Sequence, residues 1–138
     1  MISHLKLKES SFLVYGLGSS GQSVVRFFKK KKIKKFKVWD DNNKKLFKNK
    51  RTTNLNHTIN QVDYIILSPG ISLKNSKYKK TLIKSKKKII TDIDLFYLSN
   101  NKSKSIVVTG TNGKSTTCKL LAHLFQKNKF KFSLGGNI

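Results

Sequence analysis

The segment FLVYGLGSSG, residues 12–21, carries the clearest structural signal in this chain. Four apolar residues in a row are typical of a buried strand, and the glycines that follow at once mark a tight turn. Val24, Val25, Phe27 and Phe28 then recur at helical spacing, up to a run of lysines. A strand, a glycine turn and a helix in that order are typical of the first half of a parallel α/β unit.

Predicted strands and helices continue to alternate along the chain. Further strands are predicted at residues 36–39, 62–67, 88–91, 105–109 and 130–134. Helices are predicted after Gly21, from a cap at Asn75 or Ser76, over 92–98 and after Gly113. Residues 44–61 are polar and ambiguous, and both a helical turn around Leu46 and a short edge strand are compatible with them. Strands that alternate with helices predict an α/β fold with a doubly wound parallel sheet.

The predicted strands fall unevenly on the two sides of a polar segment. Residues 1–99 contain enough strands for one sheet, residues 100–104 are typical of a linker, and residues 105–138 hold one strand–helix–strand unit. One such unit cannot bury both of its faces. We therefore expect one complete domain followed by the truncated start of a second, as in the N-terminal part of a longer protein.

Composition and charge limit the function classes. The 138 residues include 30 lysines and arginines against 6 acidic residues, which gives a formal net charge of +24. The only arginines are Arg26 and Arg51, whereas specific nucleic-acid readers favour arginine. The evenly spread lysines indicate a compositional bias at exposed positions, so we expect weak, salt-sensitive polyanion binding but no specific nucleic-acid site.

Other features indicate the compartment. No apolar stretch is long enough to span a bilayer, and the first residues lack the apolar core of a secretory signal. The single Cys118 excludes an internal disulfide framework and fits a reducing setting. We expect a cytoplasmic protein with no membrane insertion.

Gly16, Gly18 and Gly21 form a G-x-G-x-x-G pattern between a predicted strand and helix. In such a loop the first glycine permits the tight turn, the second lets a phosphate approach the backbone, and the third lets the helix pack closely on the sheet. Asp40 ends the next strand, where an acidic residue can meet a ribose or base. Residues 68–70 end another strand at the same edge and fit either a wall of this site or an ordinary turn. The pattern indicates nucleotide binding; the alternative is a glycine turn that serves only packing.

The segment GTNGKST, residues 110–116, is a second phosphate-binding signal between a strand and a helix. Its amides can wrap a triphosphate, Lys114 can bridge the β- and γ-phosphates, and the Ser115 hydroxyl is placed to ligate Mg²⁺. Val108 stands where the standard P-loop pattern has its first glycine, so the match is to the Gly-Lys-Ser-Thr core. The predicted ATP-binding residues are Gly110, Thr111, Asn112, Gly113, Lys114, Ser115 and Thr116.

Together these motifs resemble those of the Mur ligases of peptidoglycan synthesis. The resemblance rests on residues 16–21, 68–71, 110–116 and 135–138, and residues 92–96 are similar to the family's passage between its first two domains. It implies a Rossmann-like sheet domain followed by the start of a P-loop-type ATP-binding domain. The Ser-Pro-Gly-Ile and Gly-Gly-Asn-Ile pieces favour the member that adds D-glutamate, while the ATP loop is shared with a superfamily that includes folylpolyglutamate synthetase.

The resemblance also implies roles for particular residues. The first domain would bind the UDP part of UDP-N-acetylmuramoyl-L-alanine, and Asn137 would reach this substrate from the second domain. The implied UDP-substrate residues are Gly16, Gly18, Ser19, Ser20, Gly21, Asp40, Ser68, Pro69, Gly70 and Asn137. Asn42 stands where the family often has a basic residue.

The implied reaction is ATP-dependent amide formation. The L-alanine carboxylate takes the γ-phosphoryl group of ATP, and the amine of D-glutamate then displaces phosphate from the acyl phosphate. Lys114 would be catalytic by neutralising charge on the moving phosphoryl group, and Ser115 would hold Mg²⁺. No Asp or Glu follows Asp94, and in the family the other metal ligands and a third domain come later in the chain, so we expect these residues to lack ligase activity by themselves. The resemblance also leads us to expect a monomer.

Two rival classes explain less of the sequence. An NAD-binding oxidoreductase explains residues 16–21 and Asp40 but leaves the Lys114 loop unexplained. A basic nucleic-acid-binding module explains the charge but neither glycine loop.

Overall fold

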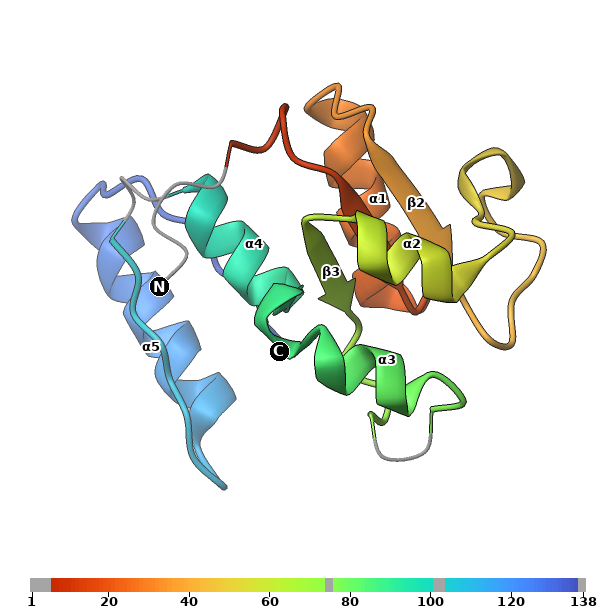
Figure 1. The fold of residues 1–138 in the computed structure, drawn as a ribbon. Coiled ribbons are helices and arrows are strands. Elements are labelled where there is room, and N and C mark those ends of the chain that lie inside the picture. Colours follow the sequence, from red (N-terminus) through yellow and green to blue (C-terminus); the bar gives the residue numbers. More distant parts are fainter. Residues whose placement is uncertain (1–5, 74–75, 101–103, 137–138) are drawn as a thin grey trace. The chain divides into compact units, whose positions relative to one another are not determined.

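The computed structural model describes residues 6–73, 76–100 and 104–136. The chain divides into two compact units, Met1–Asn101 and Lys102–Ile138 (Figure 1). The boundary falls within the polar segment that the sequence marks as a linker. The function of each unit stays a prediction.

The first unit is built on a sheet of four parallel strands. These are β1 (Phe12–Tyr15), β2 (Phe36–Trp39), β3 (Tyr64–Leu67) and β4 (Ile89–Ile90), in the order β2-β1-β3-β4. In register, Phe12 lies opposite Phe36 on one side and Tyr64 on the other. Because all four strands run the same way, the loops after β1, β2 and β3 leave from one edge of the sheet.

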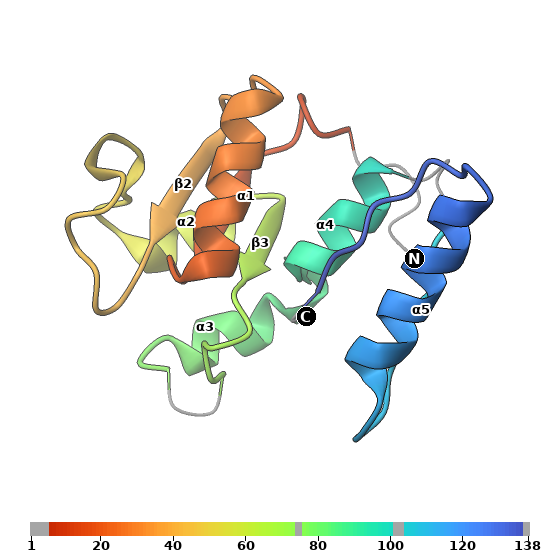
Figure 2. The same ribbon diagram turned by 180° about the vertical axis from the view of Figure 1, so that it is seen from behind.

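Helices cover both faces of this sheet. Side chains of β1 alternate, so Phe12 and Val14 pack in one cluster with α1 (Ser19–Lys30) and α4 (Asp92–Ser99). Leu13 and Tyr15 pack in the other. That second cluster is formed with α2 (Leu55–Gln61) and α3 (Lys79–Lys84). Figure 1 shows α2 in front of the sheet and Figure 2 shows α1 in front of its other face. The predicted doubly wound α/β fold is confirmed.

The ambiguous residues 44–61 contain an unpredicted helix, α2. Leu55, Thr58 and Ile59 are its buried residues, at helical spacing. The Asn54 side chain caps the helix by accepting a hydrogen bond of 3.0 Å from the His57 amide. The short η1 helix (Lys48–Lys50) precedes it. In place of an edge strand, these residues form one parallel bridge between Val38 and Arg51.

The cap predicted for the next helix is not the one observed. Helix α3 begins after Tyr78, which makes no side-chain cap bond, while the Ser76 hydroxyl accepts a hydrogen bond from the Tyr78 amide at 3.1 Å. Asn75 lies outside the described residues. The helix therefore depends on its buried Leu82 for packing.

The second unit contains the predicted helix, α5 (Lys114–Lys127), but neither predicted strand. Residues 104–109 and 130–134 form no ladder. A strand needs a neighbour to accept its backbone hydrogen bonds. Phe125 packs against Phe130 and Phe132, with ring centroids 5.9 and 5.7 Å apart. No residue of α5 is fully buried. Apolarity alone therefore overestimated the strand content of this unit.

Candidate functional site

The loop after β1 is shaped by two close backbone contacts. Gly16 has φ +96°, in the left-handed region, and a Cβ atom there would lie 2.8 Å from the Ser68 Cβ. A Cβ on Gly21 would collide with the Gly16 carbonyl. The Ser68 hydroxyl donates a 2.8 Å hydrogen bond to that carbonyl oxygen. Gly16 and Gly21 are therefore required for packing, whatever the loop binds.

Gly18 is different, because a Cβ atom there would meet nothing within 4 Å. It is the N-cap of the twelve-residue helix α1, without a side-chain cap, and its carbonyl accepts from the Gln22 amide at 3.0 Å. The preceding amides, at Ser19, Ser20 and Gly21, have no acceptor within the helix. Gly18 thus leaves an open approach to free backbone donors, which is the arrangement that binds anions.

Asp40 connects this loop to the end of β2. One oxygen of its carboxylate accepts a 2.6 Å hydrogen bond from the Leu17 amide. The other accepts from the Asn42 and Asn43 amides at 2.9 and 2.7 Å. Burial alone would raise the pKa of Asp40, but these amide bonds and the nearby Arg51 charge outweigh it and lower the pKa. Asp40 therefore orders the loop besides its predicted role at a ribose or base.

A second carboxylate at this edge has partners that the sequence did not reveal. The Tyr15 hydroxyl and the Trp39 indole donate to the two oxygens of Asp41, at 2.7 and 3.0 Å. Burial, opposed by the Ser76 hydroxyl and reinforced by Asp41, raises the pKa of Tyr15 to about 12. Tyr78 lies edge-on to Trp39, with ring centroids 6.0 Å apart. These side chains form an aromatic and acidic cluster at the end of β1 and β2.

Arg51 was also missed by the sequence analysis. Its guanidinium donates to the Asp40 and Asn43 carbonyls at 2.9 and 3.1 Å and lies 4.4 Å from the centre of the Trp39 ring. The one available signal was its identity, since only two arginines occur among so many lysines.

The turn after β3 lies at the same edge. Ser68 is half-buried against Gly16, while Pro69 and Gly70 are exposed. The Ile71 amide closes the turn on the Ser68 carbonyl at 3.0 Å. Ser68 thus has a packing role already, and the binding role predicted for residues 68–70 stays a prediction.

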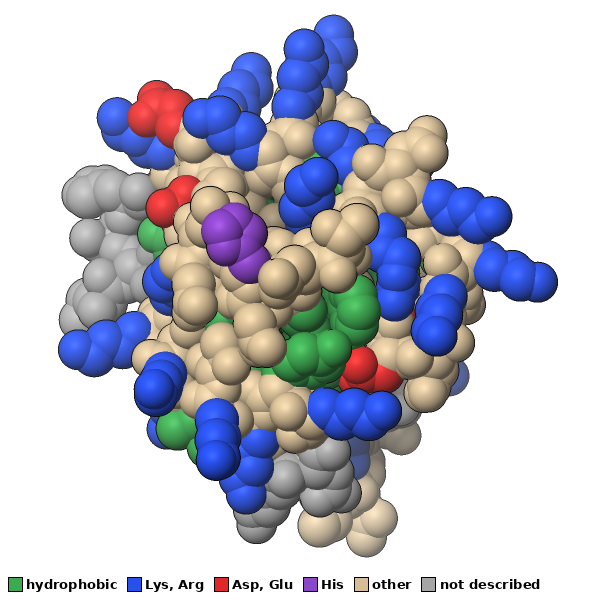
Figure 3. Space-filling view, turned by 45° about the vertical axis from the view of Figure 1, so that its right-hand side comes forward, with side chains coloured by type: hydrophobic (Ala, Val, Ile, Leu, Met, Phe, Trp, Pro, Cys, Tyr) green, Lys and Arg blue, Asp and Glu red, His purple; other side chains and the backbone are tan. Residues whose placement is uncertain are grey.

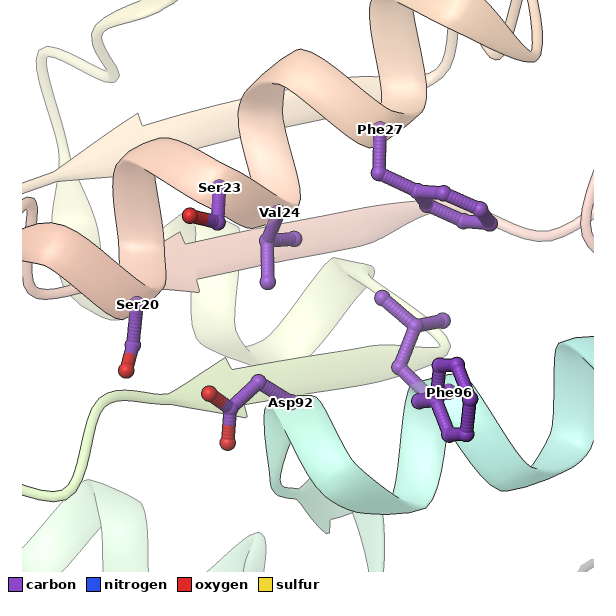
Figure 4. Close-up of a pocket in the computed structure, with 7 residues that line it drawn as sticks. Ser20, Ser23, Val24, Phe27, Asp92 and Phe96 are labelled. Carbon is purple, nitrogen blue, oxygen red and sulfur yellow. The ribbon is translucent and has the colours of Figure 1, made fainter. Parts of the chain in front are cut away.

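A separate pocket of about 180 Å³ lies between α1 and α4. Figure 4 shows Phe27 and Val24 of α1 facing Phe96 of α4, with Ser20 and Asp92 at one end. Ser20 therefore lines this pocket with its side chain, whereas Ser19 is exposed at the helix start. For a ligand of the glycine loop, the backbone amides of Ser19 and Ser20 are therefore better placed than their hydroxyl groups.

The second glycine loop, in the other unit, has its own organisation. Gly113, with φ +75°, is the N-cap of α5, and Gly110 has φ +145°. The Lys114 ammonium donates to the Gly110 carbonyl and, at 2.9 Å, to the Thr111 carbonyl. Thr111, Asn112, Ser115 and Thr116 are exposed around the helix start. The first amides of α5 have no acceptor within the helix, so this loop also presents hydrogen-bond donors that can bind an anion.

Basic side chains dominate the face of the molecule shown in Figure 3. Figure 3 shows lysine and arginine side chains projecting around one whole face, with a small hydrophobic patch and an acidic side chain near its centre. Within the described ranges, no three His, Cys, Asp or Glu side chains gather as metal ligands. None of the helices described is long and apolar enough to cross a bilayer. Asn137 lies outside the described residues.

Comparison with known proteins places the chain in a family. A doubly wound parallel sheet with a glycine loop and an open helix start at its carboxyl edge defines a Rossmann-like domain. Residues 10–91 match the family described as Mur ligase MurD-like, N-terminal domain, and the chain belongs to this family.

Several curated relatives carry the name UDP-N-acetylmuramoylalanine–D-glutamate ligase. The chain is 39% identical over 137 residues to that of Buchnera aphidicola subsp. Schizaphis graminum, covering 91% of this chain and 30% of the relative. It is 41% identical over 133 residues to that of Francisella philomiragia, covering 95% and 30%. For the Wolbachia protein from Brugia malayi the identity is 34% over 145 residues, covering 96% and 29%. The chain thus spans about 30% of the length of these relatives.

Proposed function

We propose that this chain provides the UDP-substrate-binding domain and the ATP loop of a cytoplasmic, monomeric ligase. The ligase joins D-glutamate to UDP-N-acetylmuramoyl-L-alanine with ATP, through an acyl phosphate. The observation that carries the proposal is the open approach at Gly18 to the start of α1, beside loops that converge at one sheet edge. Membership in the MurD-like family supports the choice of substrate.

In this proposal each loop receives one nucleotide. The amides at residues 19–21 bind the diphosphate of the UDP-sugar, and the turn after β2 faces its nucleoside end. Residues 110–116 bind the triphosphate of ATP, because Gly113 adopts a left-handed conformation and exposes the first amides of α5. Lys114, now bonded to loop carbonyls, exchanges these partners for the γ-phosphoryl oxygens.

The residues present fit a metal–nucleotide complex only in part. Ser115 offers one hydroxyl at the start of α5 and is the residue of this chain that would hold Mg²⁺. When bound, Mg²⁺ supplies positive charge to the phosphoryl oxygens. Lys114 adds charge at the same group, which stabilises the transition state more than the ground state. We propose that the 138 residues bind both nucleotides but do not complete the reaction.

Calorimetry on this chain with UDP-N-acetylmuramoyl-L-alanine, ATP and NAD, at raised salt, tests the proposal. Lys114→Ala should weaken ATP binding and leave the UDP-substrate affinity unchanged, while Lys119→Ala, an exposed lysine of the same helix, should change neither. In a ligase that carries this segment, Lys114→Ala should lower turnover by about 10²–10³. NAD binding tighter than the UDP-substrate, or loss of UDP-substrate affinity on Lys114→Ala, would contradict it.

A further inference from the structure

Backbone contacts alone hold Arg51 beside β2, the outer strand of the sheet. Its backbone bridges Val38 of β2, and the following Thr52 amide donates to the Val38 carbonyl at 3.2 Å. Thr52 is itself buried, with its hydroxyl 2.6 Å from that of Thr58 in α2. The guanidinium therefore starts from a rigid base.

From this base the guanidinium holds both ends of the turn formed by residues 40–43. One of its terminal nitrogens donates to the Asp40 carbonyl, the other to the Asn43 carbonyl, and its plane lies over Trp39. From inside the turn, the Asp40 carboxylate binds the amides of Asn42, Asn43 and Leu17. The turn is thus bound through its carbonyls by Arg51 and through its amides by Asp40.

The side chains of Asn42 and Asn43 are exposed at the carboxyl end of β2, next to the glycine loop. The Asp41 side chain is exposed beside them, and its two oxygens accept hydrogen bonds from Tyr15 and Trp39. In open parallel sheets, this end of the strand beside the phosphate loop is where the ribose and base of a bound nucleotide lie. The direction of these side chains depends on the turn, and the turn depends on Arg51.

We propose that Arg51 is a positioning residue for nucleoside recognition: it holds the 40–43 turn so that the turn binds the uridine end of the substrate. This inference rests on the proposed function of the first unit. A lysine could supply the same charge, but it has no planar fork for two carbonyls and no flat face for Trp39. Both terminal nitrogens of Arg51 already have carbonyl partners, so its role is geometry more than charge.

The experiment uses Trp39, the only tryptophan, as a reporter in this 138-residue chain. Its fluorescence is titrated with UDP and with CDP at high salt in the unaltered chain, Arg51→Lys, Arg51→Ala and Arg26→Lys. Arg26 is the matched control, because it is the other arginine and, in the described part of the chain, donates to the nearby Ser23 hydroxyl at 2.8 Å. Urea unfolding of each variant establishes the folded fraction.

The unaltered chain should prefer UDP to CDP. Arg51→Ala should weaken UDP binding by about tenfold or more, as expected for hydrogen bonds from a charged donor, and the UDP/CDP ratio should fall toward one. Arg51→Lys should behave like Arg51→Ala, and Arg26→Lys like the unaltered chain. The ratio is informative because it does not change when part of the protein is unfolded.

Three outcomes would overturn the inference while leaving the proposed function intact. These are full rescue by Arg51→Lys, an equal loss of UDP and CDP affinity, and equal UDP and CDP affinity in the unaltered chain. Failure of the unaltered chain to bind UDP would instead overturn the proposed function, and this inference with it.

Discussion

The carbonyl oxygen of Gly16 faces the α-carbon of Gly21 so closely that a Cβ atom built on Gly21 would collide with that oxygen. This contact joins the end of β1 to the first turn of α1. The same carbonyl oxygen accepts the Ser68 hydroxyl, so three segments of the chain meet there. The glycine pattern therefore meets two requirements. Gly16 and Gly21 permit close packing, and Gly18 leaves open the approach to the α1 amides.

Gly21→Ala tests the packing demand. The added methyl group has no room, since its neighbour is backbone, and α1 must move away from the sheet. We expect the free energy of unfolding to fall by about 3 kcal/mol or more, as for severe overpacking. Urea unfolding followed by Trp39 fluorescence measures the change, and a loss under 1 kcal/mol, roughly the scale of a simple propensity effect, would contradict it.

Gly18→Ala tests the free approach. Gly18 has φ −66° and open space around it, so alanine fits and the free energy of unfolding should stay within about 1 kcal/mol. The methyl group would instead occupy the approach to the α1 amides, and UDP affinity should fall by roughly tenfold or more. Calorimetry with UDP measures this. An unchanged affinity would show that no phosphate approaches the backbone at Gly18.

Asp63→Asn tests the response to acid. Hydrogen bonds from the Ser11 amide and hydroxyl, helped by Lys88 and Lys35 and opposed by slight burial, hold the pKa of Asp63 below 3.8. A lowered folded-state pKa adds stability above pH 3.8 that is lost as the pH falls through the folded-state value. Asp40 has a shift of the same sign.

The unaltered chain should therefore lose stability progressively as the pH falls below about 5. Asp63→Asn should be less stable at pH 7 and show a shallower decline. Urea midpoints across this range provide the measurement. Glu9→Gln is the control, because the ion pair described for Glu9 is a 3.3 Å contact with the exposed Lys6. Parallel pH curves for Asp63→Asn and the unaltered chain would count against the assignment.

Tyr15→Phe tests the buried phenol. The pKa of Tyr15 is raised to about 12, so its neutral form is favoured in the folded state. Its contribution to stability is present below pH 10 and is lost as the pH rises toward 12. Ultraviolet titration of the four tyrosines should show one late step in the unaltered chain, absent in Tyr15→Phe. If Tyr15→Phe instead removed a titration step near pH 10, the pKa of Tyr15 would not be raised by burial.

The sequence predicted the sheet well because its signals are local. Strands β1, β3 and β4 are apolar runs, β2 alternates apolar residues with Lys37, and α1 follows its glycines directly. Helix α2 was missed because Asn, His and Gln fill its exposed positions and the polar Thr58 is one of its buried residues, which obscures the spacing of Leu55 and Ile59. Residues 105–109 look like a strand, but a strand also needs a partner, which no local pattern reveals.

The site was predicted less completely for a related reason. The glycine positions are visible in the sequence because the residue type and its spacing form a local pattern. The Asp40–Leu17 bond spans 23 positions and the Arg51–Asp40 bond spans 11, and both join a side chain to the backbone. Such contacts leave no motif, so Asp40 was assigned only to a ligand and Arg51 received no role.

The strand order has a consequence for how the chain acquires its structure. Central β1 comes first in the sequence, and its neighbours β2 and β3 begin only at Phe36 and Tyr64. During synthesis both edges of β1 are therefore unpaired until β2 and β3 have been made. Apolar strands of different chains can associate at this stage. A net charge of +24 opposes such encounters by mutual repulsion. Added salt should then reduce the yield of refolding from urea, which would show that lysines away from the two glycine loops protect the nascent chain from association.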